Sequence, residues 1–234
     1  MSNDTLLHED AKWCLTRLPK TLLKMMEKEK DGLVLSGGFI RACIAGEKIS
    51  DIDLFSKSKE SAELFARRYK GKKGRMIETC NAFTVLERSK TAVQFIHRWT
   101  YETPELILPS FDFTIVRAAI WYDGSNWRGI CDARFYPDLA AKRLVYCSPV
   151  RIEEAGGSLL RVLKFYQRGY RIPLDSFAAV IARLCSAVDY TKGDPKNEEW
   201  HSFIISGLLR EVDPQTDPTE AAYFPMPESE DNNE

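Results

Sequence analysis

The stretch LSGGFIRACIAGEKISDIDLF, residues 35–55, places two adjacent glycines ahead of two aspartates that are separated by a single isoleucine. The apolar residues before Gly37 predict a short buried strand that runs into a glycine turn. Residues 39–46 predict a brief helix that ends at a glycine, and residues 51–56 alternate acidic and apolar side chains, as a second strand would. The stretch therefore predicts a strand, a turn, a helix and a strand in close succession.

These two pairs of residues suit the two halves of a metal-bound nucleotide. On a strand, residues two apart face the same way, so Asp51 and Asp53 would present both carboxylates on one side. Hard cations such as Mg²⁺ prefer anionic oxygens and usually share their shell with substrate phosphates. Gly37 and Gly38, at the start of a helix, would let backbone N–H groups approach a phosphate. Either pair alone is more often a plain turn or a solvated strand face, but together they predict a site for a nucleoside triphosphate.

The same residues resemble the nucleotidyltransferases of the DNA polymerase β superfamily, in particular the head domain shared by tRNA CCA-adding enzymes and bacterial poly(A) polymerases. The family pattern of two small residues, an Arg, a short helix and D-x-D is matched by Gly37, Gly38, Arg41, Asp51 and Asp53. The family motif R-R-D-F-T-I-N-A is similar to SFDFTIVRAA at residues 110–119. A third stretch, EEAGGSLLRVLKFYQRGYRI at residues 153–172, is similar to the family's neck helix.

The resemblance implies an α+β fold, with a polymerase β-like nucleotidyltransferase head of a small mixed sheet and helices, followed by a helical neck. It also implies two-ion nucleotidyl transfer with Mg²⁺, or Mn²⁺ as an alternative. The catalytic residues and metal ligands it implies are Asp51, Asp53 and Asp112. The nucleotide-binding residues it implies are Ser36, Gly37, Gly38, Arg41, Arg161 and Lys164. Of these, Arg41 either pairs with phosphate or anchors Asp51, and the last two share a helix face.

The sequence departs from the family at the residues that select the incoming base. In CCA-adding enzymes an Asp and an Arg of the neck motif hydrogen-bond that base, and alignment on LLRVLKF puts Ala155 and Ser158 at their positions. Neither side chain can make the hydrogen bonds of an Asp or an Arg at these positions. Further departures are Ala42, Ser110, Phe111 and Val116. We therefore expect base choice that is loose or differently coded, and we do not expect synthesis of CCA.

Three functions remain open. The first is a template-independent polymerase that joins nucleotides from an NTP or dNTP to an oligonucleotide end. The layout also resembles small nucleotidyltransferases of bacterial antiviral systems, such as the Hailong type. The second is transfer to a protein hydroxyl, for which Tyr223 or Ser229 of the chain's own tail would be an acceptor at high effective concentration. The third is a non-catalytic nucleotide-binding module, and a tRNA 3′-end nucleotidyltransferase stays an alternative within the enzyme class.

The sequence predicts an organisation in four parts. These are an N-terminal helix over residues 1–30, the head over 31–145, the helical neck over 146–210 and an acidic, flexible tail over 211–234. The tail holds eight acidic residues and no Lys or Arg, so the rest of the chain carries about +7, from 33 basic and 26 acidic residues. A basic body favours phosphate-bearing partners.

Further helices and strands are predicted by periodicity. The helices are expected at residues 3–29 with a break at Pro19, and at 59–71, 136–144, 153–170 and 173–190. The strands are expected at residues 76–88, 92–99 and 111–122. The basic segment at residues 67–75 either tracks a nucleic-acid backbone or is a solvated helix end.

The composition gives expectations for the localisation, the cysteines and the self-association of the protein. No apolar run reaches transmembrane length and the N-terminus has no export signal, so we expect a cytoplasmic protein with no membrane partner. The six cysteines are scattered without a C-x-x-C pair, which predicts reduced, mostly buried thiols and no cysteine-bound metal. Apolar helix faces near either terminus leave self-association open.

Overall fold

A computed structural model describes residues 3–30, 32–71, 74–86, 91–149, 155–194 and 196–210. The chain divides into two compact units, and each is described by itself. The first unit is Met1–Ala141 with Cys147–Val150, and the second is Lys142–Tyr146 with Arg151–Glu234. The division into four parts stays a prediction, and the tail with Tyr223 and Ser229 lies outside the described residues.

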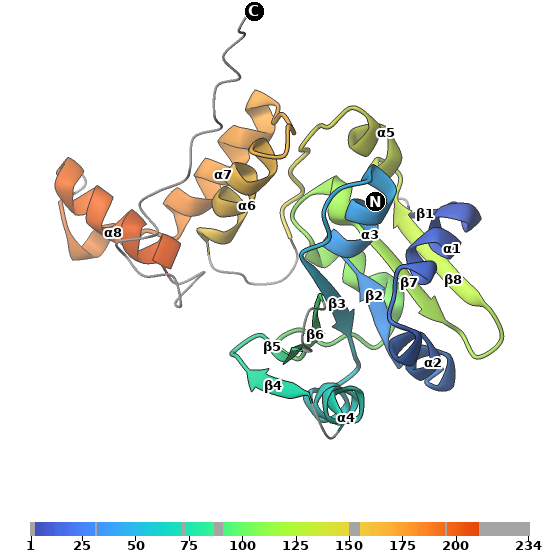
Figure 1. The fold of residues 1–234 in the computed structure, drawn as a ribbon. Coiled ribbons are helices and arrows are strands. Elements are labelled where there is room, and N and C mark those ends of the chain that lie inside the picture. Colours follow the sequence, from blue (N-terminus) through green and yellow to red (C-terminus); the bar gives the residue numbers. More distant parts are fainter. Residues whose placement is uncertain are drawn as a thin grey trace, which may run out of the picture. The chain divides into compact units, whose positions relative to one another are not determined.

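The first unit is built on an eight-stranded mixed sheet (Figure 1). Its strands are β1 (Asn3–Thr5), β2 (Val34–Ser36), β3 (Asp51–Phe55), β4 (Arg75–Glu78), β5 (Ala82–Leu86), β6 (Ala92–Ile96), β7 (Ala118–Tyr122) and β8 (Trp127–Asp132). Their order across the sheet is β1, β8, β7, β2, β3, β6, β5, β4. Strands β3 and β6 pair in parallel, and the other neighbours pair antiparallel. Strand β3 is therefore an interior strand, held by hydrogen bonds on both sides.

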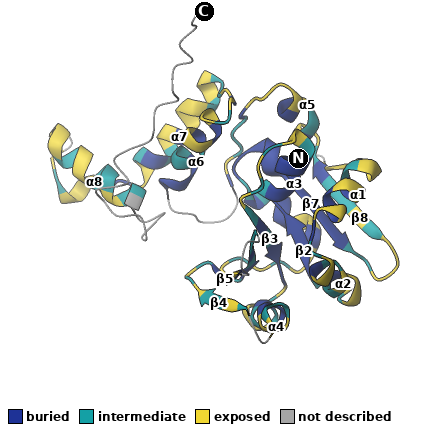
Figure 2. Cartoon of the chain, in the orientation of Figure 1, coloured by how far each residue is buried: buried dark blue, intermediate teal, exposed yellow. Residues whose placement is uncertain are grey.

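Helices lie on both faces of this sheet. In chain order they are α1 (His8–Thr16), α2 (Lys20–Lys28), α3 (Gly38–Ala45), α4 (Lys59–Lys70), the 3₁₀ helices η1 (Pro104–Ser110) and η2 (Thr114–Val116), and α5 (Phe135–Ala140). On one face, Ile107 and Leu108 of η1 join a buried cluster with Ala119 and Trp121 of β7. The central strands and α3 are largely buried (Figure 2).

Helix α1 lies on the opposite face. Ile120 and its cross-strand partner Gly129 point away from η1, and a Cβ at Gly129 would lie 3.7 Å from Cβ of Ala11 in α1. The Trp13 indole N–H of α1 donates to the backbone carbonyl of Cys43 in α3, with a donor–acceptor distance of 3.1 Å. Helix α1 is thus packed into the first unit through α3, and α2 contacts β7.

The second unit is helical. It contains α6 (Gly157–Tyr166), α7 (Leu174–Ser186), the 3₁₀ helix η3 (Tyr190–Lys192) and α8 (Glu198–Arg210). Helices α6 and α7 pack together. The rings of Phe165 and Tyr170 meet edge to face at a centroid distance of 5.5 Å, and Tyr170 is buried. Arg143 and Arg171 form an isolated parallel bridge.

The α+β class is confirmed, and three local predictions need correction. Residues 3–29 begin with β1, although the predicted break at Pro19 is found. Residues 76–88 contain parts of two strands, and within 111–122 a strand begins only at Ala118 because 3₁₀ turns precede it. Strand β8 was not predicted, since a charged residue and a glycine interrupt its apolar pattern.

The cysteines also differ from the expectation of mostly buried thiols. Cys14, Cys43 and Cys131 are buried, Cys80 is exposed, and Cys147 and Cys185 are half-buried. Burial raises the pKa of Cys131 to about 12, so that thiol stays protonated at neutral pH. No helix in the described part of the chain has both the length and the apolar content that a membrane crossing requires.

Candidate active site

Strand β3 presents Asp51 and Asp53 on one face. Both side chains are half-buried, whereas Ile52 and Leu54 are buried. This alternation arises because neighbouring residues of a strand point to opposite faces. Asp51 Oδ1 accepts a hydrogen bond of 2.8 Å from Ser50 Oγ. The two carboxylates are therefore fixed on an interior strand and remain accessible.

The glycine turn between β2 and α3 lies beside this strand. Gly37 has φ +85° and ψ −140°, a conformation that suits glycine, and its N–H donates to the Ala118 carbonyl at 3.3 Å. A Cβ at this position would lie 3.2 Å from the Phe111 ring and 4.0 Å from Asp53 Oδ2. At Gly38 a Cβ would meet nothing within 4 Å. The turn thus brings the start of α3 next to the Asp53 carboxylate.

The first turn of α3 is open to an anion. No side chain among the described residues caps the helix at Gly37. The first N–H groups of a helix lack partners inside the helix and carry a favourable potential for negative charge. With the space at Gly38, these groups can receive a phosphate oxygen.

Ser36 and Arg41 have structural partners. Ser36 is fully buried, and its hydroxyl donates to the Ala118 carbonyl at 2.6 Å. The only hydroxyl proton is therefore committed, which argues against the expected phosphate contact of this side chain. Arg41 is 2% exposed and forms an ion pair with Glu47 at the end of α3. Glu47 is thus a partner that the sequence did not suggest for Arg41.

Asp112 occupies a different environment from the two strand aspartates. It lies between η1 and η2 and is 3% exposed. Its backbone carbonyl accepts a hydrogen bond of 2.7 Å from the Cys147 N–H. The expectation that Asp112 sits on a strand is wrong, because it lies in the short connection between the 3₁₀ helices η1 and η2.

Two buried side chains that sequence reasoning missed hold the segment around Asp112. Arg117, 1% exposed, donates to the Phe111 carbonyl from Nε at 2.9 Å and from Nη2 at 2.7 Å. It also lies 3.6 Å from Asp132. Buried Asp138 accepts a hydrogen bond of 2.7 Å from Thr114 Oγ1. An arginine inside the apolar run IVRAA was the available signal, since a buried charge needs partners.

The fit of the carboxylates to a divalent ion is partial. Asp51 and Asp53 offer the anionic oxygens that Mg²⁺ prefers, on one face and within reach of phosphate at α3. Among the described residues, no three His, Cys, Asp or Glu side chains are grouped so that they could hold a metal. The three-carboxylate cluster expected with Asp112 is therefore not formed in this structure.

The remaining predicted nucleotide ligands lie in the second unit. Arg161 is half-buried and Lys164 is exposed on α6. Their expected contact with the nucleotide stays a prediction. Ala155 and Ser158, at the positions of the family's base-selecting residues, are both buried. Because both side chains are buried, and because neither can make the hydrogen bonds of an Asp or an Arg, neither would select a base.

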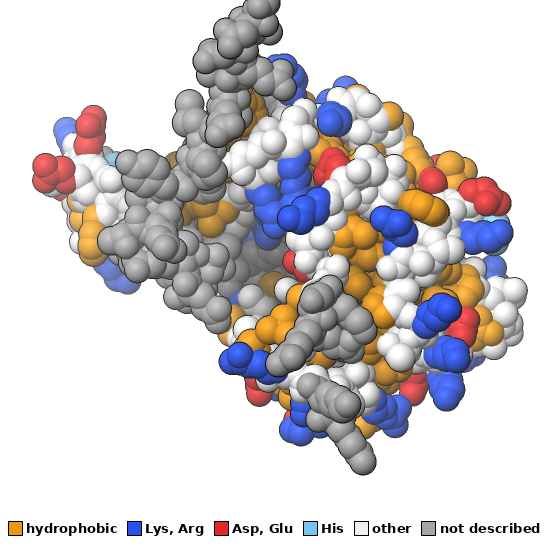
Figure 3. Space-filling model, viewed as in Figure 1, with side chains coloured by type: hydrophobic (Ala, Val, Ile, Leu, Met, Phe, Trp, Pro, Cys, Tyr) orange, Lys and Arg blue, Asp and Glu red, His pale blue; other side chains and the backbone are white. Residues whose placement is uncertain are grey.

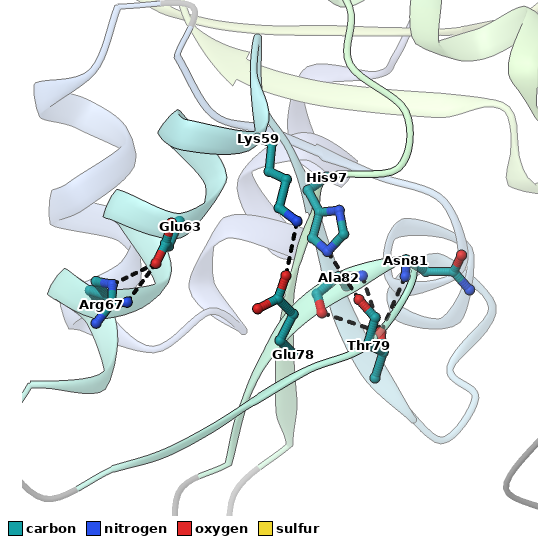
Figure 4. Close-up of polar contacts among 8 residues, drawn as sticks. All are labelled: Lys59, Glu63, Arg67, Glu78, Thr79, Asn81, Ala82 and His97. Carbon is teal, nitrogen blue, oxygen red and sulfur yellow. Dashed lines mark hydrogen bonds and ion pairs between the residues drawn. The ribbon is translucent and has the colours of Figure 1, made fainter.

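The basic segment at residues 67–75 begins inside α4 with two paired arginines. Arg67 Nε donates to Glu63 at 2.9 Å (Figure 4), and Arg68 lies 2.9 Å from Glu29. These pairs are exposed and contribute about 0–1 kcal/mol each. At Arg67 and Arg68, these ion pairs favour the interpretation as a solvated helix end over the interpretation as a binding site for a nucleic-acid backbone.

His97 and Lys59 also have local partners in this region (Figure 4). His97 Nε2 lies 3.1 Å from the Thr79 carbonyl. Lys59 bridges to Glu78 at 2.9 Å, and the lysine lowers the pKa of that carboxyl. Both contacts tie β4 and the turn after it to their neighbours, so a structural role accounts for them.

Comparison with known proteins gives a family and a fold. The family model described as "Gabija anti-defense 2 family protein" matches residues 8–142. No curated protein matches the chain.

Among solved structures, the Thermotoga maritima CCA-adding enzyme complexed with tRNA has a TM-score of 0.57 and 18% identity, covering 95% of this chain and 53% of that one. A CCA-adding enzyme complexed with ATP has a TM-score of 0.58 and 19% identity, covering 95% and 53%. A complex with CTP has a TM-score of 0.55 and 17% identity, covering 94% and 58%. The chain spans about half the length of these enzymes, and the likeness shows a polymerase β-like nucleotidyltransferase fold.

Proposed function

This chain belongs to the Gabija anti-defense 2 family, and from that membership and the geometry of its candidate site we propose that it is a metal-dependent nucleotidyltransferase acting against a bacterial antiviral defence system. The observation that carries the activity is the position of Asp53 Oδ2, 4.0 Å from where a Cβ would stand at Gly37. A carboxylate pair and a helix start meet there. This is the arrangement that a metal-bound triphosphate requires.

The proposed reaction follows from the two groups that meet here, the start of α3 and the carboxylates of β3. The first N–H groups of α3 would receive phosphate oxygens of the triphosphate, and Asp51 and Asp53 would hold a divalent ion beside them. When bound, the ion neutralises charge on the leaving pyrophosphate and lowers the pKa of the acceptor hydroxyl. The hydroxyl oxygen bonds to the α-phosphorus, the bond to the bridging oxygen breaks, pyrophosphate leaves, and the hydroxyl proton passes to water.

We propose an oligonucleotide end as the acceptor, extended without a template. The solved structures of the same fold are complexed with CTP, ATP and tRNA, which supports a nucleotide and a nucleic acid as partners. The burial of Ala155 and Ser158 supports base choice without the family's protein template. A protein hydroxyl, including Tyr223 or Ser229, is the alternative acceptor, and a tRNA 3′ end is the alternative nucleic acid.

One observation favours a second candidate function. Asp112 is buried, and the described residues hold no three-carboxylate group. A nucleotide-binding module without catalysis would need only the glycine turn and the two strand aspartates. The two candidates differ in whether label is transferred.

The test is incubation of the purified chain with each α-labelled NTP and dNTP and Mg²⁺, first alone, then with a single-stranded oligonucleotide, then with tRNA. Products are resolved on denaturing gels before and after protease or nuclease. We expect a nuclease-sensitive ladder that disappears in Asp53→Asn and persists in Asp4→Asn, a matched exposed aspartate on β1. Protease-sensitive label would indicate a protein acceptor. Nucleotide binding without transfer under all conditions would contradict the enzyme and favour the binding module.

A further inference from the structure

Helices α1 and α3 each turn a cysteine toward the other helix. Cys14 Sγ of α1 lies 3.9 Å from the backbone carbonyl oxygen of Ile40 in α3, and the two helices pack together. In a helix, a side chain leans over the turn N-terminal to its own Cα, so the Cys43 side chain covers the turn that begins at Ile40. The bond from the Trp13 indole to the Cys43 carbonyl holds the same parts of the two helices side by side. The thiols of Cys14 and Cys43 therefore meet at this helix contact.

The two thiols differ in how readily they lose a proton. The Cys14 thiol, as a hydrogen-bond donor to the Cys43 sulfur, lowers the pKa of Cys43 against the effect of burial, and the charge of Arg17 acts in the same direction. The contact with Cys43, together with burial, raises the pKa of Cys14. Figure 3 shows Lys and Arg side chains at the surface on the side of the first unit where α1 and α2 lie. Because the thiolate is the nucleophile and positive surroundings favour it, Cys43 is the thiol that reacts first.

Access to solvent separates the two thiols in the same way. Cys43 is 7% exposed, whereas Cys14 is fully buried. A small oxidant can therefore reach Cys43, and Cys14 lies behind it. Cys131 provides a contrast, since it is 1% exposed and burial raises its pKa to about 12. A thiol that is both protonated and buried should be inert.

We propose that Cys14 and Cys43 are a peroxide-reactive thiol pair that closes to a disulfide between α1 and α3. The Cys43 thiolate attacks one oxygen of hydrogen peroxide, the O–O bond breaks, and the other oxygen takes a proton and leaves as water. Cys43 is then a sulfenic acid. The Cys14 sulfur bonds to the Cys43 sulfur, and the sulfenic hydroxyl leaves as water with the Cys14 proton. The two thiols are oxidised, the peroxide is reduced to water, and the reaction is independent of nucleotide transfer.

The bond has a consequence for stability. It closes the chain between residues 14 and 43 into a loop that contains α2, β2 and the glycine turn. Such a crosslink removes conformational freedom from the unfolded chain. We expect the melting temperature of the oxidised chain to exceed that of the reduced chain by about 5 °C or more, and a dithiol to reverse the change.

The test treats the full reduced chain with a series of hydrogen peroxide concentrations. The remaining thiols are alkylated in denaturant, and tryptic peptides are mapped by mass spectrometry without reduction. We expect residues 13–17 and 42–48 to appear as one linked pair, lighter by two hydrogen atoms than the two peptides together and separated by a dithiol. Cys131 should be alkylated throughout, as the internal control.

Cysteine variants assign the two roles. In Cys14→Ser the sulfenic acid of Cys43 has no thiol to close with, so dimedone labelling of residues 42–48 should rise by about tenfold or more over the parent. Cys14→Ala should give the same labelling without placing a hydroxyl in the buried site. Cys43→Ser should leave residues 13–17 without dimedone. Cys80→Ser is the matched control, because it removes an exposed thiol and should still form the linked pair.

Three results would overturn the proposal. The first is oxidation of exposed Cys80 in the parent chain without any linked pair of residues 13–17 and 42–48, which needs no variant to fold. The second is dimedone on Cys14 in Cys43→Ser with none on Cys43 in Cys14→Ser or Cys14→Ala. The third is a melting temperature that falls on oxidation, since the two helices would then not be placed for the bond.

Discussion

Asp53 and Gly37 face each other across the turn between β2 and α3, with Oδ2 of the aspartate 4.0 Å from the position of a Cβ at the glycine. The two residues are 16 positions apart in sequence, and the pairing of β2 with β3 brings them together. The Phe111 ring approaches the same point from the loop between η1 and η2. This point is therefore sensitive to small changes on any of three segments.

Replacing Gly37 by alanine should damage both the turn and the site. The backbone conformation at φ +85° costs a residue with a Cβ roughly 1–3 kcal/mol, and the Cβ would press on the Phe111 ring at 3.2 Å. We expect a lower melting temperature and weaker Mg·ATP binding, measured by calorimetry. Gly38→Ala is the control for stability alone, since its Cβ meets nothing within 4 Å and alanine favours a helix by up to about 1 kcal/mol, so its melting temperature should not fall. An equal loss of melting temperature in the two variants would contradict the assigned geometry.

Replacing Asp53 by asparagine should separate function from stability. The side chain is half-buried, so the fold should change by no more than about 1 kcal/mol in urea unfolding. Mg²⁺-dependent nucleotide binding and transfer should fall by at least about 100-fold, as expected when an ion ligand is lost. Binding that stays the same with and without Mg²⁺ in the variant and the parent would refute the metal role.

Replacing Arg117 by methionine should destabilise the first unit. Its guanidinium is 1% exposed and serves the Phe111 carbonyl and Asp132, so removal leaves buried polar groups without a partner. We expect a loss of about 3–5 kcal/mol in the free energy of unfolding, read from urea midpoints. Arg128→Met removes an exposed pair with Asp123 and should cost less than about 1 kcal/mol. A mild effect at Arg117 would show that the buried contacts are replaceable.

Asp123 should titrate at low pH. The backbone N–H of Asn126, then Arg128 and the Ser125 N–H, stabilise its carboxylate and lower its pKa to about 2. Because the folded pKa lies below the ordinary value of 3.8, this stabilisation is present above pH 4 and is lost as the pH falls toward 2. NMR titration of the side-chain carboxyl should give this value, and Arg128→Ala should raise it. A titration near the ordinary value would contradict the turn geometry.

The succession of strand, glycine turn, helix and strand over residues 34–55 could be predicted because its sequence signals are local. The glycine turn, the helix that ends at Gly46 and the alternation around Asp53 each depend on a few neighbouring residues, and the structure has all three elements. The loop position of Asp112 could not be predicted, because an apolar run such as FDFTIV is equally compatible with a strand and with buried 3₁₀ turns. The pairing of Arg41 with Glu47 could have been predicted, since Arg41 lies in one short helix and Glu47 follows directly after its end.

The edge elements were missed for a different reason. Strand β8 pairs with β7, which directly precedes it in a hairpin, and with β1, which lies far away in the sequence, and Gly129 weakens its apolar pattern. Arg117 shows the same limit, because its partners at Phe111, Asp132 and Cys147 are assembled only by the fold. Such contacts need tertiary information that periodicity does not contain.

The interior position of β3 has a consequence for how the protein unfolds. Strands β1 and β4 stand at the two ends of the sheet, whereas β3 is bonded to β2 on one side and β6 on the other. Amide hydrogens of Ile52 and Leu54 should therefore exchange with solvent only when the whole sheet unfolds, while terminal strands exchange through local fraying. The candidate site is thus lost in the same cooperative step as the fold, and partial melting at either end of the sheet leaves its two aspartates in place.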